Sequence, residues 1–259
     1  MTTTAPAFRI EDLSVRYGST LALDSLNAEI PHGLVTGLVG PNGSGKTTLL
    51  RTMYGALSPS QGRVLLNGRP LASLTPRTIS REISVVVQQS FIPHRMSVLD
   101  EVLLGRMPFV SDFSPYRDED RELALEALEA VGMIDKSRRR SDELSGGERQ
   151  RVVIARALAQ GSRCILLDEP TNHLDIRYQH EVLGLLRALG RTVLVVLHDL
   201  NMAARYCDRI HILSAGRMHS VGAADQVLLE NTIAELYGVA VSRIEHCGRP
   251  QFLFTSPTR

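Results

Sequence analysis

"GLVGPNGSGKTTLL", residues 37–50, joins a short apolar run to a segment of helical character through a glycine-rich loop. It fits the pattern G-x-x-x-x-G-K-[ST], in which glycines let backbone N–H groups close around phosphate and the lysine adds a positive charge. The helix that follows directs its positive end toward the same anion. The order of strand, loop and helix favours a phosphate site over an ordinary glycine-rich turn. The predicted phosphate contacts are Gly40, Pro41, Asn42, Gly43, Ser44, Gly45, Lys46, Thr47 and Thr48, with the Thr47 hydroxyl also offered to Mg²⁺.

Strand-like and helical segments alternate along the chain. Short β-rich runs surround the loop, and a helical period takes over between about residues 97 and 160. Strand-like runs then return at "CILLDE" (164–169), "TVLVVLHD" (192–199) and "RIHILSAG" (209–216). This alternation predicts an α/β fold with a parallel sheet covered by helices. We expect one domain over residues 8–250, with a β-rich N-terminal part, a helical subdomain at about 90–160 and a short tail at 223–259.

Composition limits the classes of protein that fit. The 259 residues are 43% hydrophobic and 22% charged, as in an ordinary globular protein. A net charge of +1 produces no bulk field that would attract nucleic acid, so we expect no nucleic-acid partner. The basic run at residues 136–140 is interpreted as a solvated loop. No segment has the pattern of a signal peptide, and the longest aliphatic run (193–197) is too short to span a bilayer. We therefore expect a cytoplasmic protein whose membrane role comes through a partner.

A second candidate for chemistry is "CILLDEP" (164–170), an apolar strand that ends in two acids. Adjacent carboxylates at the end of a buried strand need a compensating charge. Asp168 is the candidate Mg²⁺ ligand, directly or through water. Glu169 would point the other way from the strand and polarise an attacking water. An acidic strand end alone is usually the start of a loop, but beside a phosphate-binding loop it favours an enzyme.

The third candidate is "ELSGGERQRVVIARALA" (143–159). Ser145 and Glu148 have the spacing of a capping box, which predicts a well-capped helix. Two successive glycines, Gly146 and Gly147, weaken a helical turn by roughly 1 kcal/mol each relative to alanine. Glycines at a helix N-terminus let an anion approach the backbone closely. The stretch therefore predicts a second phosphate-binding helix end. Three apolar residues share one face of this helix: Val152, Ala155 and Ala159.

"LSGGERQ" also resembles the signature sequence of ATP-binding cassette (ABC) ATPases, and the family's other motifs follow in order over about residues 8–222. The resemblance implies that ATP and Mg²⁺ occupy the site. It implies that Tyr17, in "SVRYGS", stacks on the adenine ring, although a surface tyrosine is the alternative. "TNHLD" resembles the D-loop, which ends at Asp175. His198, in "VLHDLN", corresponds to the switch histidine that contacts the γ-phosphate.

The family also has a glutamine that touches Mg²⁺ and senses the membrane partner. "VVVQQS" supplies it in this chain. Gln88 is the first glutamine after the apolar strand and is the preferred candidate. Gln89 remains the alternative, because Val87 stands where the family usually has a proline. The resemblance therefore assigns Gln88, Glu169 and His198 to catalysis.

In this family ATP is held between the phosphate-binding loop of one copy and the signature of another, so the resemblance implies a homodimer. "HDLNMAARYCDRI" and "GRMPF" resemble the subunits that drive uptake of ferric siderophores, haem and cobalamin, and ferric siderophores are preferred. A multi-span permease and, indirectly, an extracytoplasmic binding protein are then expected, with this chain on the cytoplasmic face of the inner membrane. A soluble, non-transport ABC ATPase is the alternative of a different class. The motifs alone do not show the direction of transport.

Overall fold

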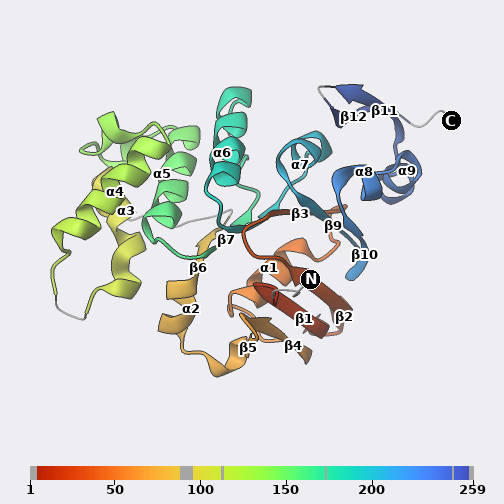
Figure 1. Cartoon of the computed structure of the whole chain (residues 1–259), viewed down its shortest axis with the longest axis horizontal. Helices are drawn as coiled ribbons and strands as arrows, with labels where there is room; N and C mark the ends of the chain where they lie inside the picture. The colour runs from red at the N-terminus through yellow and green to blue at the C-terminus, as the bar shows by residue number, and fades with distance from the viewer. Residues whose placement is uncertain (1–4, 88–95, 112–113, 173, 247, 257–259) are drawn as a thin grey trace.

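A six-stranded sheet forms the centre of the molecule (Figure 1), in the order β10-β9-β3-β8-β7-β6. The computed structural model describes residues 5–87, 96–111, 114–172, 174–246 and 248–256. Strand β10 pairs antiparallel with β9, and the other neighbours in this sheet are parallel. The six strands are β3 (Val35–Val39), β6 (Ile83–Val86), β7 (Cys164–Asp168), β8 (Thr192–Val196), β9 (Arg209–Ser214) and β10 (Arg217–Gly222). The predicted parallel sheet is therefore confirmed.

Both faces of this sheet are covered, which explains why its strands are apolar runs without polar alternation. All five residues of β7 are buried. Ile165 and Leu167 pack into one core, whereas Cys164 and Leu166 face the other. The first core lies between the sheet and three helices: α5 (Gly146–Ala159), α6 (Ile176–Ala188) and α7 (Leu200–Tyr206).

The opposite face packs against helix α1 (Lys46–Met53) and a second, antiparallel sheet, the β-rich N-terminal part that the sequence predicts. The strand order in this sheet is β2-β1-β4-β5. Its members are β1 (Phe8–Tyr17), β2 (Thr20–Ile30), β4 (Gln61–Leu66) and β5 (Arg69–Pro70). Helix α2 (Pro76–Glu82) then leads into β6. Strands β2 and β10 lie close to each other where the two sheets meet, and Arg217 forms an ion pair with Asp24 at this junction.

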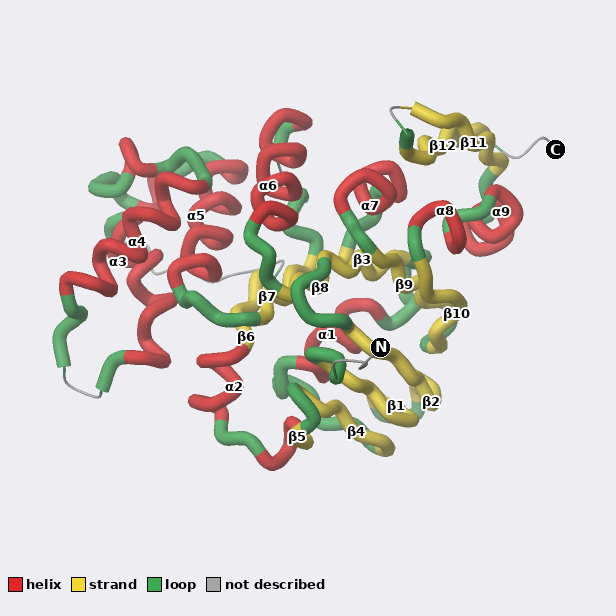
Figure 2. The backbone as a smooth tube through the Cα atoms, viewed as in Figure 1, coloured by secondary structure: helices red, strands yellow, loops and turns green. Residues whose placement is uncertain are grey.

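Helices gather at one end of the central sheet (Figure 2), where α3 (Val98–Leu103) and α4 (Asp118–Ala130) pack against α5. The helical character expected over residues 97–160 is thus confirmed for the described part of that range. In α5 the predicted apolar face is also confirmed, since Val152, Ala155 and Ala159 are at most 2% exposed.

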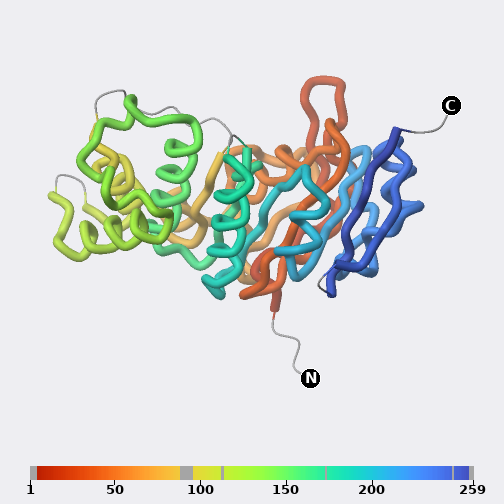
Figure 3. The backbone as a smooth tube through the Cα atoms, turned by 90° about the horizontal axis from the view of Figure 1, so that it is seen from above, coloured from red at the N-terminus to blue at the C-terminus, as the bar shows by residue number. Residues whose placement is uncertain are grey.

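The C-terminal segment lies at the opposite end of the sheet from α3 and α4 (Figure 3). It contains two short helices, α8 (Ala224–Val227) and α9 (Glu230–Tyr237), followed by a hairpin of β11 (Ala240–His246) and β12 (Arg249–Thr255). The short tail expected from the sequence is thus helical at first and ends in two strands that pair with each other. Across the residues described here, no helix is both long enough and apolar enough to cross a bilayer.

Candidate active site

The glycine-rich loop leads from the end of β3 into α1, and its path requires glycine. Gly40 has φ 149°, and a Cβ there would lie 2.0 Å from the carbonyl oxygen of Leu213. Gly45 has φ 102°, and its Cβ would lie 2.8 Å from the carbonyl oxygen of Ala22. Both positions combine a backbone conformation that favours glycine with a contact that excludes any side chain. The two fixed glycines of the pattern are therefore explained by this turn.

The N-terminus of α1 is built to receive an anion. Gly45 is its N-cap and makes no side-chain capping bond, so the first N–H groups of the helix have no partner within it. Lys46 Nζ donates to the carbonyl oxygens of Gly40, at 2.8 Å, and Pro41, at 2.9 Å. Burial lowers the pKa of Lys46, and the charges of Glu169 and Asp168 oppose that shift. A buried cation beside uncapped helix N–H groups suits phosphate.

Thr47 and Asp168 lie together where the sequence expects a magnesium site. Thr47 Oγ1 donates to Asp168 Oδ1 at 3.3 Å. Burial raises the pKa of Asp168, the Thr47 hydrogen bond lowers it, and the nearby charge of Glu169 raises it. No cluster of three or more His, Cys, Asp or Glu side chains forms a metal site within the described ranges. One carboxylate and one hydroxyl fit Mg²⁺ nevertheless, since that ion is usually bound by one or two carboxylates together with phosphate oxygens and water.

Glu169 is held on both of its carboxylate oxygens. His198 Nε2 donates to Oε1, and Asn172 Nδ2 donates to Oε2 at 2.6 Å. Glu169 has φ 52°, so the chain turns sharply as soon as β7 ends. From sequence, the direction of the Glu169 side chain is inferred from the alternation of side chains along a strand. In the structure this turn, and not that alternation, directs the side chain toward the glycine-rich loop. Asn172 was missed by sequence reasoning, although its place three residues after Glu169 suits a local side-chain contact.

These groups converge on one cavity of about 350 Å³. Tyr17 lies at its rim, with 47% of its surface exposed, as an adenine platform requires. Most of the groups predicted for phosphate, together with Glu169 and His198, therefore share a single cavity, whereas Gly40, Pro41, Ser44 and Asp168 do not line it. Its lining is Tyr17, Ala22, Asn42, Gly43, Gly45, Lys46, Thr47, Thr48, Glu169 and His198.

The signature residues and Asp175 do not line this cavity. Ser145 is exposed and caps α5: its hydroxyl accepts from Glu148 N at 3.4 Å, and Glu148 Oε2 accepts from Ser145 N at 2.9 Å. The predicted capping box is thus confirmed. Asp175 caps α6 by accepting from Tyr178 N at 3.0 Å. The exposed end of α5, with Gly146 and Gly147 as its first residues, is available to another molecule.

Lys136, which lies outside the signature sequence, contacts the first turn of α5. Its ammonium is paired with Glu148, which helps to lower the pKa of that carboxyl to about 2; the Ser145 bonds contribute the rest. The interpretation of residues 136–140 as a solvated loop misses this contact, because it depends on how the loop returns to α5. The remaining predicted residue, Gln88, and its alternative Gln89 lie outside the described residues.

Comparison with known proteins agrees with this geometry. Residues 23–172 match the family described as ABC transporter. The chain is 40% identical to the iron(3+)-hydroxamate import ATP-binding protein of Bacillus subtilis, over 88% of this chain and 87% of that protein. It is also 40% identical to the hemin import ATP-binding protein of Pseudomonas entomophila, over 90% and 92%.

Two solved structures show the same fold. A metal-chelate type ABC transporter in an inward-facing conformation superposes with a TM-score of 0.82 and 28% identity, covering 96% of this chain and 97% of that one. The dimeric structure of a bacterial ABC transporter cassette superposes with a TM-score of 0.76 and 30% identity, covering 84% and 98%. The chain therefore belongs to the ABC transporter family, in which it is an ATP-binding cassette.

Proposed function

We propose that this ATPase drives a membrane importer for ferric siderophores. The observation that carries the proposal is the single cavity in which a buried lysine, a helix N-terminus and the Glu169–His198 pair meet. Similarity to iron-chelate and hemin import subunits over most of the chain supports the transport role. Haem and cobalamin are the alternative cargoes. A soluble, non-transport ATPase is the alternative of a different class.

We assign the triphosphate to the loop at residues 40–48, with Lys46 on the β- and γ-phosphates and Tyr17 against the adenine. Thr47 and Asp168 would hold Mg²⁺, directly or through water, with Gln88 as a further ligand. When bound, that ion supplies positive charge that neutralises the phosphate oxygens. The lowered pKa of Lys46 fits this assignment, because a bound phosphate would stabilise the charged ammonium that burial disfavours.

Hydrolysis requires Glu169 to accept a proton from the attacking water. One of its oxygens is bound to His198 and the other to Asn172. We infer that Asn172 keeps the carboxylate in place while His198 turns from Oε1 toward the γ-phosphate. The freed Oε1 then faces the water, and the histidine N–H stabilises charge on the transferred group. In this proposal Glu169 and His198 act in the same step, and both begin from the hydrogen-bonded pair that they form in the structure.

The signature end of α5 would complete the site of a second copy of this chain. Ser145, Gly146 and Gly147 are accessible and lie outside the chain's own cavity. The dimeric cassette structure supports a paired arrangement. Asp175, at the end of the D-loop, would contribute to the nucleotide site. We propose a head-to-tail homodimer with two composite sites.

The cassette would work on the cytoplasmic face of the membrane, bound to a multi-span permease and served indirectly by an extracytoplasmic binding protein. In this proposal residues 8–250 form one cassette domain. It contains a helical subdomain at about 90–160, and residues 223–259 form a tail. The segment between Gln88 and Tyr116 would lie against a cytoplasmic helix of the permease. No nucleic-acid partner is expected.

Reconstitution tests the proposal as a whole. The chain, its permease and its binding protein are incorporated into proteoliposomes, and uptake of radiolabelled ferric siderophore, haem and cobalamin is measured. Siderophore should accelerate ATP hydrolysis and enter the vesicles, and the Glu169→Gln variant should do neither. Uptake of haem or cobalamin alone would replace the cargo, and outward movement would reverse the direction. ATP hydrolysis that no permease or cargo alters would favour the soluble alternative.

A further inference from the structure

Helix α7 begins at Leu200, and its N-cap, Asp199, directly follows His198, so whatever fixes the first turn of the helix also fixes the backbone of the histidine. Asp199 is the N-cap and accepts from the backbone N–H groups of Asn201, at 2.8 Å, and Met202, at 3.1 Å. His198 itself is exposed, with 46% of its side chain accessible, and it forms a hydrogen bond with Glu169. Its position therefore depends on the backbone of this turn.

The C-terminal hairpin holds that first turn through Asn201. Asn201 Nδ2 donates to the carbonyl oxygen of Phe252 at 3.1 Å, and Phe252 N donates to Asn201 Oδ1 at 2.7 Å. The amide thus pairs with β12 as a neighbouring strand would. Phe252 is 2% exposed and packs into the larger core, which keeps this part of the hairpin in place.

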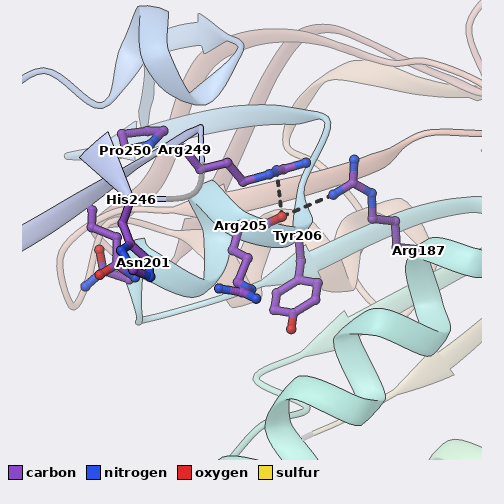
Figure 4. A pocket seen from close by; sticks show the side chains of 8 residues that line it. Arg187, Asn201, Arg205, Tyr206, His246, Arg249 and Pro250 are labelled. Carbon is purple, nitrogen blue, oxygen red and sulfur yellow. Dashed lines mark hydrogen bonds between the residues drawn. The ribbon is translucent and has the colours of Figure 1, made fainter. Parts of the chain in front are cut away.

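The same hairpin holds the last turn of α7 (Figure 4). Arg249 Nη1 donates to the carbonyl oxygens of Ala204, at 3.1 Å, and Arg205, at 2.6 Å. Arg187, from α6, donates to the Arg205 oxygen as well, at 3.2 Å. Guanidinium groups satisfy the free carbonyls at a helix C-terminus and favour its negative end. A seven-residue helix is thereby clamped at both ends by one hairpin.

The C-terminal segment also lies beside His198 itself. Tyr237, Val239 and Phe254 line a cavity of about 550 Å³ together with His198 and Leu200. Burial raises the pKa of the Tyr237 hydroxyl to about 12. The tail and the histidine therefore line the same cavity.

We propose that Asn201 is a positioning residue and that the C-terminal hairpin, acting through it, holds His198 in register with Glu169. The proposal rests on the function proposed above for His198. It gives the tail a role in the rate of hydrolysis rather than in nucleotide affinity, because the hairpin's hydrogen bonds described above go to α7 and not to the phosphate-binding loop at residues 40–48.

The test compares Asn201→Ala with Asn27→Ala in the full chain. Asn27 is a matched control, since its amide makes a similar double contact with Asp12, at 2.9 and 3.0 Å, in the antiparallel sheet. Asn201→Ala should lower kcat on the order of tenfold, below the 10²–10⁴ of a complete acid–base group. Kd for a fluorescent ATP analogue should stay unchanged, and amides of residues 199–203 should exchange hydrogen faster. Asn27→Ala should change none of these three measurements.

A double variant separates positioning from loss of folding. If Asn201 acts through His198, adding Asn201→Ala to His198→Ala should lower kcat no further, whereas a general loss of folded protein would lower it again. Arg249→Gln provides an independent test at the other end of α7 and should reduce kcat less, because Arg187 still binds the Arg205 carbonyl. Wild-type kcat in both Asn201→Ala and Arg249→Gln would overturn the proposal.

His198→Ala distinguishes this failure from failure of the proposed function. If His198→Ala hydrolyses ATP normally, the role of the histidine is wrong and the positioning role falls with it. If His198→Ala has a strongly reduced kcat while Asn201→Ala and Arg249→Gln are both normal, the histidine keeps its role and the hairpin inference alone is overturned.

Discussion

His198 donates from Nε2 to Glu169 Oε1, and this bond joins the ends of two neighbouring strands, β8 and β7. Parallel neighbours end at the same edge of a sheet, which brings residues 29 positions apart into contact. Glu169 reaches the bond from a left-handed turn that a non-glycine residue rarely adopts. Conformations of this kind persist where the surrounding structure fixes them, and they concentrate at functional sites. The Glu169–His198 bond therefore depends both on the adjacent ends of β7 and β8 and on the left-handed turn at Glu169.

The first prediction concerns Glu169→Gln. The amide keeps the shape of the side chain but lacks a basic oxygen, so ATP should bind with wild-type affinity while hydrolysis falls by about 10²–10⁴. Equilibrium binding and single-turnover cleavage measure the two effects. Trapped ATP should also hold two chains together in size-exclusion chromatography with MgATP. A variant that stays monomeric and hydrolyses at the normal rate would contradict both the base and the paired arrangement.

The sequence predicts the position of this site better than its internal contacts. The order of strand, loop and helix around Lys46, and the apolar strands that precede Asp168 and His198, follow from local patterns that survive in the fold. The contacts of Asn172 and Asn201 do not follow from such patterns. Each depends on a turn or a hairpin whose geometry is set by tertiary packing, and side-chain amides occur in many exposed loops.

Lys46→Ala is the second prediction. Lys46 is 6% exposed and its ammonium donates to two loop carbonyls, so its removal deletes a buried charge at the phosphate position. A charge-assisted contact is worth about 2 kcal/mol, which corresponds to roughly 30-fold weaker ATP binding. Titration with a fluorescent ATP analogue measures it. Lys136→Ala is the control, because it removes the chain's other lysine, which pairs with Glu148 on α5. Equal affinity in the two variants would remove Lys46 from the site.

A third prediction concerns stability at acid pH and rests on His211 in β9. Burial, with a smaller effect from Arg209, lowers the pKa of His211 to about 4. Between about pH 6.5 and pH 4 the unfolded chain binds a proton that the folded chain does not, so stability falls as the pH falls through this window. His211→Leu should reduce this loss by on the order of 3 kcal/mol.

Urea unfolding at pH 7.5 and pH 4.5 measures the difference, with His219→Leu as the control. His219 is an exposed histidine on the neighbouring strand β10. The control should lose stability with acid as the wild type does. An unchanged pH dependence in His211→Leu would show that another group is responsible.

The fourth prediction tests whether each site is shared between two chains. Ser145 is exposed and outside the cavity that contains Lys46, so the two residues cannot complete one site within a chain as it stands. A mixed dimer of a Lys46→Ala chain and a Ser145→Arg chain keeps one wild-type loop and one wild-type signature. In the shared arrangement these face each other, and about half of the wild-type sites survive. The Ser145→Arg homodimer has none.

Differently tagged chains, co-purified as the mixed pair, allow ATP turnover per dimer to be compared with the two parent homodimers. The expected result is recovery in the mixed dimer and none in either parent. Sites formed within one chain would behave in the opposite way, since each mixed chain would then carry its own defect and mixing would restore nothing. Introducing Glu169→Gln into the Ser145→Arg chain should abolish the recovered turnover, because that chain supplies the intact loop and its catalytic carboxylate. The same change in the Lys46→Ala chain should leave the turnover unaltered, and this asymmetry identifies which chain performs the cleavage.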